Sequence, residues 1–566
     1  MFKKLITSPV KSITSAAMII GGLSLVSRLL GIFRDRILAS EFGAGDILDT
    51  YYAAFRLPDL VFNLLVLGAI SAGLIPVFTT LVSKRKKDEA WLLISGILNI
   101  LISGLIVISV IIIIFAPWIM KVITPGFSLD KMQLVISLTR IMFLSPIFLG
   151  ISAIFGSILQ SYKRFFVYSL APIFYNLGII IGVIYFIDIW GIYGLAWGVV
   201  LGSVLHMIVQ LISAFALGFK YQWGFNWHDK NVRLVGRLMI PRTLTLVINQ
   251  VNILIVTIIA STLAVGSLAI FNLANNLQGF PLGIFGVSFA IAALPVLSAY
   301  VAQNNMNKFV DTISSTFRQT LFFILPISII LYVLRAQVVR VILGAGQFDW
   351  IDTRLTAASL AIFTLSLFAQ GTLPLIVRGF YALHNSKTPF YIGLFSLVVN
   401  VVGLMFFRWV FGFSNWFSFF TVAVLRIGDL WQVADLRILA LPAAISLSSI
   451  FNLVLLMIWL RREIGRLDGR KIIDSTTRIL FASLGAGLFT YAFLQIIDLM
   501  IATQTFVGIF VQGMAAGVFG LAGYWIVAAL LKMGEMEVFI SSLRRKLLKS
   551  ASLMVTEDSS GEGEGI

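Results

Sequence analysis

SYKRFFVYSLAPIFYN at residues 161–176 and NSKTPFYIGLFSLVVN at residues 385–400 share one pattern, a lysine and a closing asparagine at equal spacing. Two further motifs recur at nearly the same offset along the chain: Ala39-Ser40 with Gly45 as Ala260-Ser261 with Gly266, and Leu74-Ile75-Pro76-Val77 as Ala293-Leu294-Pro295-Val296. The chain therefore contains an internal repeat, and its amino-acid composition indicates what kind of structure is repeated.

The composition is that of a membrane protein, because 59% of the residues are hydrophobic and 12% are charged. A soluble domain averages about half apolar and about a quarter charged residues. A helix that crosses a bilayer needs about 20 mostly apolar residues. About fourteen stretches meet this length, namely 14–42, 58–83, 91–118, 132–160, 166–187, 190–217, 236–262, 268–300, 316–336, 354–383, 388–412, 434–460, 473–497 and 505–531.

The repeat places six of these spans in each copy, and an even number gives both copies the same orientation. Parallel repeats are used by transporters to build two lobes around a central path. The sequence thus predicts an all-α polytopic membrane protein with two six-helix lobes in parallel repeat and two C-terminal helices. We expect the first lobe at residues 1–217, the second at 218–462, helices 13 and 14 at 463–532 and a cytoplasmic tail at 533–566.

The connections between successive spans are alternately rich and poor in lysine and arginine. The formal net charge of the chain is +17. Positively charged connections stay in the cytoplasm, so both termini are expected inside and the segment near Asp46 outside. The basic residues are spread over many separated segments, whereas a nucleic-acid surface gathers them on one face, so no nucleic-acid partner is expected.

We recognise no catalytic, metal-binding or cofactor-binding motif in the sequence. The chain has no cysteine and three scattered histidines, which argues against disulfides, thiolate metal sites and cysteine nucleophiles. We find no nucleophile with a nearby base, no metal-spaced acids and no phosphate-binding glycine loop, so we expect no enzyme, no cofactor and no metal site. Transport by such a chain would run on an ion gradient or on the membrane potential.

Arg28, Arg34 and Asp35 lie inside the first apolar span, where a charge costs at least about 2.5 kcal/mol on insertion scales. Each should therefore face protein or a watery cavity. Arg28 and Asp35 are two helical turns apart and share a face. One interpretation is a structural ion pair with snorkelling of the arginines. The other is an anion site, because the planar guanidinium matches phosphate and stays charged when desolvated.

Polar residues also cluster in the seventh and eighth spans. Arg242, Asn249 and Asn252 follow one face of the seventh span. The eighth span carries Asn272, Asn275, Asn276 and Gln278. These side chains either pack helices together through interhelical hydrogen bonds or line a cavity at the start of the second lobe.

The segment SRLLGIFRDRILASEFGAGDILDTYYAAFRLPDL at residues 27–60 resembles the start of the MurJ (MviN) family of lipid II flippases. Further matching motifs run through both lobes in order: TPGF at 124–127, PRTLTLVINQVN at 241–252, NLANNLQGFPLGIFG at 272–286, VRVILGAGQFD at 339–349 and RGFYALHNSKTP at 378–389. The resemblance implies the fold of the multidrug/oligosaccharidyl-lipid/polysaccharide exporters, with helices 13 and 14 flanking a groove for a lipid tail.

The resemblance also implies substrate-binding positions. The family's charged positions in the first span match Arg28, Arg34 and Asp35, and Asp49 and Arg56 fit the following motif. The sequence departs from the family where arginine and acid align with Asn276 and Gly279, and where Phe62, Asn63 and Leu67 follow the LPDL motif. We therefore expect Arg28, Arg34, Asp35, Arg56, Arg242, Asn249, Asn252, Asn275, Asn276 and Gln278 to bind substrate. Arg242 could replace the missing family arginines, or it could anchor the end of its helix.

The function implied is the movement of lipid II from the inner to the outer leaflet of the bacterial cytoplasmic membrane by alternating access. Two alternatives stay open, export of another undecaprenyl-linked saccharide and a non-transporting scaffold for cell-wall enzymes. The expected partners are lipid II, membrane lipids and, as a further prediction, cell-wall synthesis proteins.

Overall fold

A computed structural model of the chain describes residues 13–67, 73–413, 415–427, 435–500 and 505–541. Throughout these ranges the chain forms helices and turns and contains no strand. Ten of the described helices are long and apolar enough to cross a bilayer, and a pair bent by 47°, α17 (Trp350–Thr364) with α18 (Leu367–Ala382), adds an eleventh candidate. The prediction of an all-α polytopic membrane protein is confirmed, and the exact number of fourteen spans stays a prediction.

The three remaining expected spans lie in helices that charge or a break makes less apolar. Span 14–42 is α2 (Ile13–Phe42), which carries Arg28, Arg34, Asp35 and Arg36. Span 58–83 is divided into α4 (Arg56–Val61), the π-helix η1 (Phe62–Leu67) and α5 (Ile75–Ser83), and residues 68–72 lie outside the described part. Span 236–262 belongs to α12 (Lys230–Ser261), of which Leu246–Ser261 forms the apolar portion.

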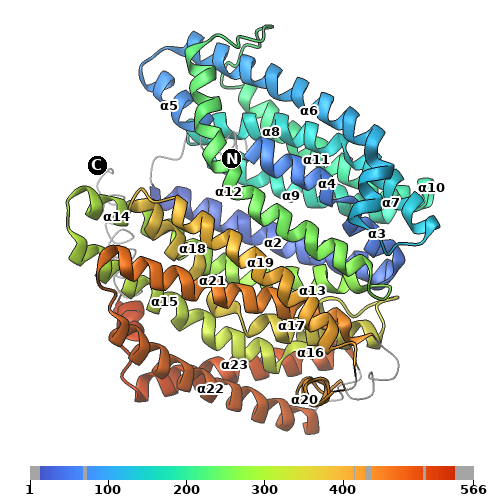
Figure 1. The fold of residues 1–566 in the computed structure, drawn as a ribbon, viewed down its shortest axis with the longest axis vertical. Coiled ribbons are helices and arrows are strands. Elements are labelled where there is room, and N and C mark those ends of the chain that lie inside the picture. Colours follow the sequence, from blue (N-terminus) through green and yellow to red (C-terminus); the bar gives the residue numbers. More distant parts are fainter. Residues whose placement is uncertain (1–12, 68–72, 414, 428–434, 501–504, 542–566) are drawn as a thin grey trace, which may run out of the picture. The chain divides into compact units, whose positions relative to one another are not determined.

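The structure divides into two compact units, and the first comprises residues 1–277, 342–359 and 393–448. Besides the helices already given, this unit contains α3 (Asp46–Ala54), α6 (Lys87–Ile123), α7 (Leu129–Met142), α8 (Leu144–Ser161), α9 (Phe165–Ile181), η3 (Gly182–Phe186), α10 (Ile187–Trp190), α11 (Tyr193–Phe215), most of α13 (Ser267–Pro281) and of α19 (Lys387–Val410), α20 (Trp416–Leu425), η6 (Leu436–Leu439) and the start of α21 (Ala440–Ile464). Figure 1 shows α12 as one long continuous helix.

The second unit comprises residues 278–341, 360–392 and 449–566. Its helices are η4 (Leu282–Val287), α14 (Ser288–Ala302), α15 (Met306–Val333), nearly all of α16 (Arg335–Ile342), α18, the end of α21, α22 (Gly469–Met500) and α23 (Phe506–Leu530). These units cut across the expected lobes and are a different division of the chain. The lobe boundaries at 217 and 462 therefore stay a prediction.

The appended pair α22 and α23 packs side by side, and α22 also packs on α15 (Figure 1). The Tyr524 hydroxyl donates to the Phe322 carbonyl over 2.7 Å, which ties α23 to α15. Beyond α23, the carboxylate of Glu535 pairs with Arg318 and accepts a hydrogen bond of 2.8 Å from the Ser475 hydroxyl. Polar contacts thus hold the C-terminal helices to the apolar core of this unit.

Glycines allow α9 and α11 to approach closely within the first unit. A Cβ at Gly178 would lie 2.2 Å from the Gly202 Cα, and a Cβ at Gly182 would lie 2.4 Å from the Gly198 Cα. Small residues at every fourth position are a common device for packing membrane helices, because backbones then meet directly. Larger side chains at these positions would push the two helices apart.

The repeat seen in the sequence has a counterpart in the packing of the first unit. Asn176 of α9 contacts α2, and Asn400 Nδ2 of α19 donates to the side-chain oxygen Oδ1 of Asn252 in α12 over 2.5 Å. The closing asparagine of each repeat therefore meets the first helix of its own copy. This correspondence supports the parallel repeat.

One helix was not expected. The segment between spans 388–412 and 434–460 was predicted to be a connection, but it contains the apolar helix α20. Its ten residues are too few to cross a bilayer, which requires about 20. A search for spanning lengths therefore missed it.

Candidate functional site

The charged residues of α2 form a hydrogen-bonded network within the first unit. Arg34 donates to Asp35 Oδ1 from Nε over 3.0 Å and from Nη2 over 2.7 Å. Its Nη1 donates to Asn176 Oδ1 of α9 over 3.0 Å, and Asn276 of α13 donates to Asp35 Oδ2 over 2.9 Å. Asp35 is 5% exposed, so its charge is compensated by a neighbouring cation and a neutral amide.

Arg56, at the start of α4, makes a second contact with α13. Its Nη2 donates to Asn272 Oδ1 over 2.7 Å, and Asn272 in turn donates to the Leu268 carbonyl. The Nε of Arg56 and the hydroxyl of Tyr52, one turn earlier, are buried and have no hydrogen-bond partner among the residues that the structure describes. Buried polar atoms are nearly always paired, so these two are candidates to meet a ligand or water.

Asp49 of α3 holds the first turn of α13. Its carboxylate accepts hydrogen bonds of 2.8 Å from the amides of Gly266 and Ala269, and Lys131 Nζ lies 2.9 Å from Oδ2. A carboxylate at a helix N-terminus satisfies free amides and complements the helix dipole. Asp49 is 3% exposed and fully used in these contacts, so it stabilises the position of α13.

Two glycine contacts cross between the repeat copies at this same end of the unit. A Cβ at Gly126 would lie 2.2 Å from the Ser261 carbonyl oxygen, and a Cβ at Gly346 would lie 2.2 Å from the Ser40 carbonyl oxygen. Gln347 adds a hydrogen bond from its amide to the Ser40 carbonyl over 2.8 Å. Ser40 and Ser261 are equivalent in the repeat, so each copy places a glycine against the first helix of the other.

The structure brings several predicted site residues together. Arg34, Asp35 and Asn276 share one network, and Arg56 joins α13 through Asn272. Asn252 bonds to Asn400 and not to the charged network. The structure records an ion pair between Asp35 and Arg34 in the first span.

The other predicted positions are placed separately. Arg28, Asn249 and Asn275 have exposed side chains on α2, α12 and α13. Gln278 belongs to the second unit, where its buried Oε1 accepts from Gln370 Nε2 over 3.4 Å. Arg242 lies in α12, and its side chain is outside the described residues.

Asn176 is the site residue that sequence reasoning missed, although it had been found as part of the repeat. The signal was available, because a polar residue that recurs in both copies of an apolar repeat requires a partner. Within the described part of the chain, no three histidines or acids lie close enough together to hold a metal ion.

The fold and these buried polar contacts define the chain as a polytopic helical membrane protein of the fold that two groups of transporters share. A structure of the lipid II flippase MurJ in an inward closed conformation aligns with a TM-score of 0.71 at 23% identity, over 91% of this chain and 98% of that one. An inward-facing multidrug resistance MATE family transporter aligns with a TM-score of 0.61 at 14% identity, over 79% of this chain and 98% of that one.

The family follows from the sequence comparisons. The sequence model described as "Lipid II flippase MurJ" matches residues 38–512. The chain is 30% identical over 389 residues to a probable lipid II flippase MurJ of Rhizobium tropici, covering 67% of this chain and 73% of that protein. It is 28% identical over 393 residues to the lipid II flippase MurJ of Burkholderia cenocepacia, covering 68% and 76%. The chain therefore belongs to the lipid II flippase MurJ family, a family of transporters and not of enzymes.

Proposed function

We propose that this chain moves lipid II from the inner to the outer leaflet by alternating access, with Arg34 and Arg56 holding the diphosphate. The match to the family over residues 38–512 carries this proposal. The relatives in Rhizobium tropici and Burkholderia cenocepacia are named as lipid II flippases, and the chain covers about three quarters of each.

The bonding of the two arginines supports their role. Arg34 and Arg56 both donate to asparagine amide oxygens, which are neutral acceptors. A diphosphate oxygen would form a charge-assisted bond, roughly twice as strong as a neutral one, and could replace either amide. Arg56 Nε is in addition buried without a partner among the described residues, so a phosphate could satisfy it without breaking a bond.

Asp35 sets the geometry of the first arginine. It accepts two hydrogen bonds from Arg34, which fixes the plane of the guanidinium and leaves Nη1 directed at Asn176. Asn276 completes the arrangement by donating to the other oxygen of Asp35. We assign Asp35 and Asn276 a positioning role, while Arg28, Asn249, Asn252, Asn275, Gln278 and Arg242 stay candidates for contacts with the sugar-peptide head.

The direction of opening follows from the crossed glycine contacts. They lie at the end of the unit that contains Asp46, the segment expected outside the cell. With Gly126 and Gly346 seated against the opposing helices, we infer that this end is closed. Transport requires these contacts to separate when the protein opens outward.

The orientation and the organisation of the chain belong to the same proposal. Both termini lie in the cytoplasm, the lobes comprise residues 1–217 and 218–462, and helices 13 and 14 precede a cytoplasmic tail at 533–566. Accessibility of tags at either terminus and near Asp46 tests the orientation, since the reverse pattern would overturn it. Pull-down with cell-wall synthesis enzymes tests the proposed protein partners.

The direct test is complementation of a bacterium depleted of its own flippase, with accessibility of lipid II on the outer leaflet as the readout. Rescue with restored accessibility is expected. A second candidate, export of another undecaprenyl-linked saccharide, is favoured by Asn276, since its neutral amide stands where the resemblance places an arginine. Failure to rescue, together with accumulation of a different lipid-linked saccharide in a deletion strain, would favour that candidate.

A further inference from the structure

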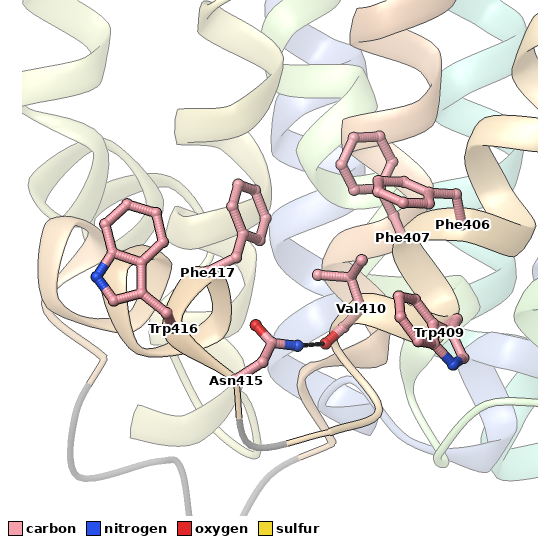
Figure 2. A pocket seen from close by; sticks show the side chains of 7 residues that line it. All are labelled: Phe406, Phe407, Trp409, Val410, Asn415, Trp416 and Phe417. Atoms are coloured by element: carbon pink, nitrogen blue, oxygen red, sulfur yellow. Dashed lines mark hydrogen bonds between the residues drawn. The ribbon is translucent and has the colours of Figure 1, made fainter.

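An apolar cavity of about 390 Å³ lies between the end of α19 and the start of α20. Figure 2 shows Phe406, Phe407, Trp409 and Val410 on α19 facing the cavity, with Asn415, Trp416 and Phe417 at the start of α20. Its size is within the range of about 300–1,000 Å³ that is typical of small-ligand sites. The lining is almost entirely apolar, so its occupant must be apolar as well.

The start of α20 forms one wall of the cavity, and two of its side chains hold it against the end of α19 by hydrogen bonds. Asn415 Nδ2 donates to the Val410 carbonyl over 2.6 Å (Figure 2), and Asn415 Oδ1 accepts from the Ser418 amide over 2.8 Å as the N-cap of α20. The Ser418 hydroxyl donates to the same Val410 carbonyl over 3.0 Å. The free carbonyl at the end of α19 is thus satisfied by the next helix.

The composition of α20 places it in lipid. Its two hydroxyl side chains, Ser418 and Thr421, donate to backbone carbonyls, so neither needs water. A helix that is apolar on all sides is buried in protein or in a membrane. Phe419 and Phe420 are 54% and 51% exposed, so α20 is not buried in this protein. At ten residues and about 15 Å it cannot cross the bilayer core of about 30 Å.

The depth of the cavity follows from α19. This helix has 24 residues and a length of about 36 Å, enough to cross the core, so Val410 at its end lies near the boundary of the membrane. Trp409 and Trp416 are 63% and 78% exposed there, and tryptophan collects at membrane interfaces. The guanidinium of Arg408, in the last turn of α19, makes no hydrogen bond or ion pair with any described residue and can meet a lipid phosphate.

We propose that the cavity between α19 and α20 binds the acyl chain of a bilayer phospholipid, with α20 lying in the interface as its wall. The cavity lies near the boundary of the bilayer core, where the lipids beside α19 can enter it. The acyl chain of such a lipid is apolar and therefore matches the lining. The site is independent of the arginine network, so it does not depend on the proposed function.

The test uses the full chain in vesicles of phosphatidylethanolamine and phosphatidylglycerol that contain phosphatidylglycerol with a photoactivatable diazirine in its acyl chain. Adducts are expected on the peptide that spans residues 406–417. Val410→Trp fills the cavity and should lower labelling there by about tenfold, the loss that corresponds to removing one apolar contact surface. Val402→Trp is the matched control, because Val402 is an exposed residue of the same helix outside the cavity, and it should leave labelling unchanged.

A second variant keeps the proposal testable if Val410→Trp does not fold. Phe417→Ala enlarges the cavity, and labelling should persist with adducts shifted toward α19, at unchanged abundance and elution. Three results would overturn the proposal: equal labelling in Val410→Trp and Val402→Trp, labelling by a photoactivatable polyprenyl diphosphate in place of the phospholipid, or crosslinks through α20 between two copies of the chain.

Discussion

The helix pairs α2–α9 and α12–α19 occupy equivalent places in the repeat, yet the repeated asparagine meets a charged side chain in the first pair and a neutral amide in the second. Gly31 and Asn252 stand at the same distance before the repeated Ala-Ser pair. Gly31 leaves room beside Asn176, whose carbonyl oxygen accepts from Arg34, whereas Asn252 fills the equivalent space and accepts from Asn400. The same helix packing thus supports a cation in one copy and a neutral amide pair in the other.

The comparison extends to the positions of the charges themselves. Counted from the same Ala-Ser pair, Arg34 and Asp35 of α2 correspond to Ile255 and Val256 of α12. Val256 is buried, as an apolar residue in a membrane helix should be. The two copies thus share their helix packing and differ at these two positions, which are charged in the first copy and apolar in the second.

The largest effect is expected from Arg34→Ala. Each charge-assisted hydrogen bond contributes about 1.5–3 kcal/mol, so loss of the Nη1 bond to a diphosphate should reduce transport by about 10- to 100-fold. Complementation should fail while insertion and abundance stay near normal. Ile255→Ala, at the equivalent position of the other copy, is the control and should retain transport. Loss of the protein with full specific activity of what remains would instead assign Arg34 a structural role.

Next in size are substitutions at the crossed glycines. Gly346 has φ +54°, so Gly346→Val meets both the Ser40 carbonyl and a backbone strain of about 1–3 kcal/mol. Gly126→Val meets the backbone of Ser261 and Thr262 but adds no strain from a positive φ, so it should be milder. Both should open the expected external end and lower transport.

Thiol labelling measures this opening, because the chain has no cysteine and Ser40→Cys supplies a single probe. Labelling of Ser40→Cys should rise when Gly126→Val is added and stay low with Gly104→Ala, whose Cβ meets nothing within 4 Å. Unchanged labelling with Gly126→Val would mean that the glycine contact does not hold that end closed.

Substitutions of Arg242 test whether the second copy of the repeat contributes a cation to substrate binding. Charge reversal should hurt more than neutralisation, so Arg242→Glu should abolish complementation and Arg242→Ala should weaken it. Arg242→Lys should retain part, because lysine keeps the charge without the planar fork. Full activity of Arg242→Ala at normal abundance would leave the cations to the first copy.

The smallest effect is expected from Asn400→Leu. It removes the hydrogen bond to Asn252 and should lower the free energy of unfolding by about 1 kcal/mol without loss of transport. Asn176→Leu should cost similar stability but reduce transport, because Arg34 loses the acceptor that positions Nη1 before substrate binds. Equal transport in the two variants, measured beside their thermal unfolding, would contradict the division into a charged and a neutral half.

The sequence by itself predicted the membrane class, the repeat, the family and most of the helices. Hydropathy and motif spacing are local properties, so they can be read without knowledge of packing. The charged residues inside α2 were also identifiable, since an arginine at membrane depth stands out against apolar neighbours. The same length criterion missed α20, which is apolar but too short to span.

Only the tertiary structure decided which side chains meet. Arg34 and Asn176 are far apart in the chain, and so are Asp49 and the amides of Gly266 and Ala269 that donate to its carboxylate. Such partners depend on the rotation and depth of each helix, which are set by contacts between distant segments, such as glycines against backbone carbonyls. Composition determines that a helix lies in the membrane, and packing determines what each of its polar residues can bind.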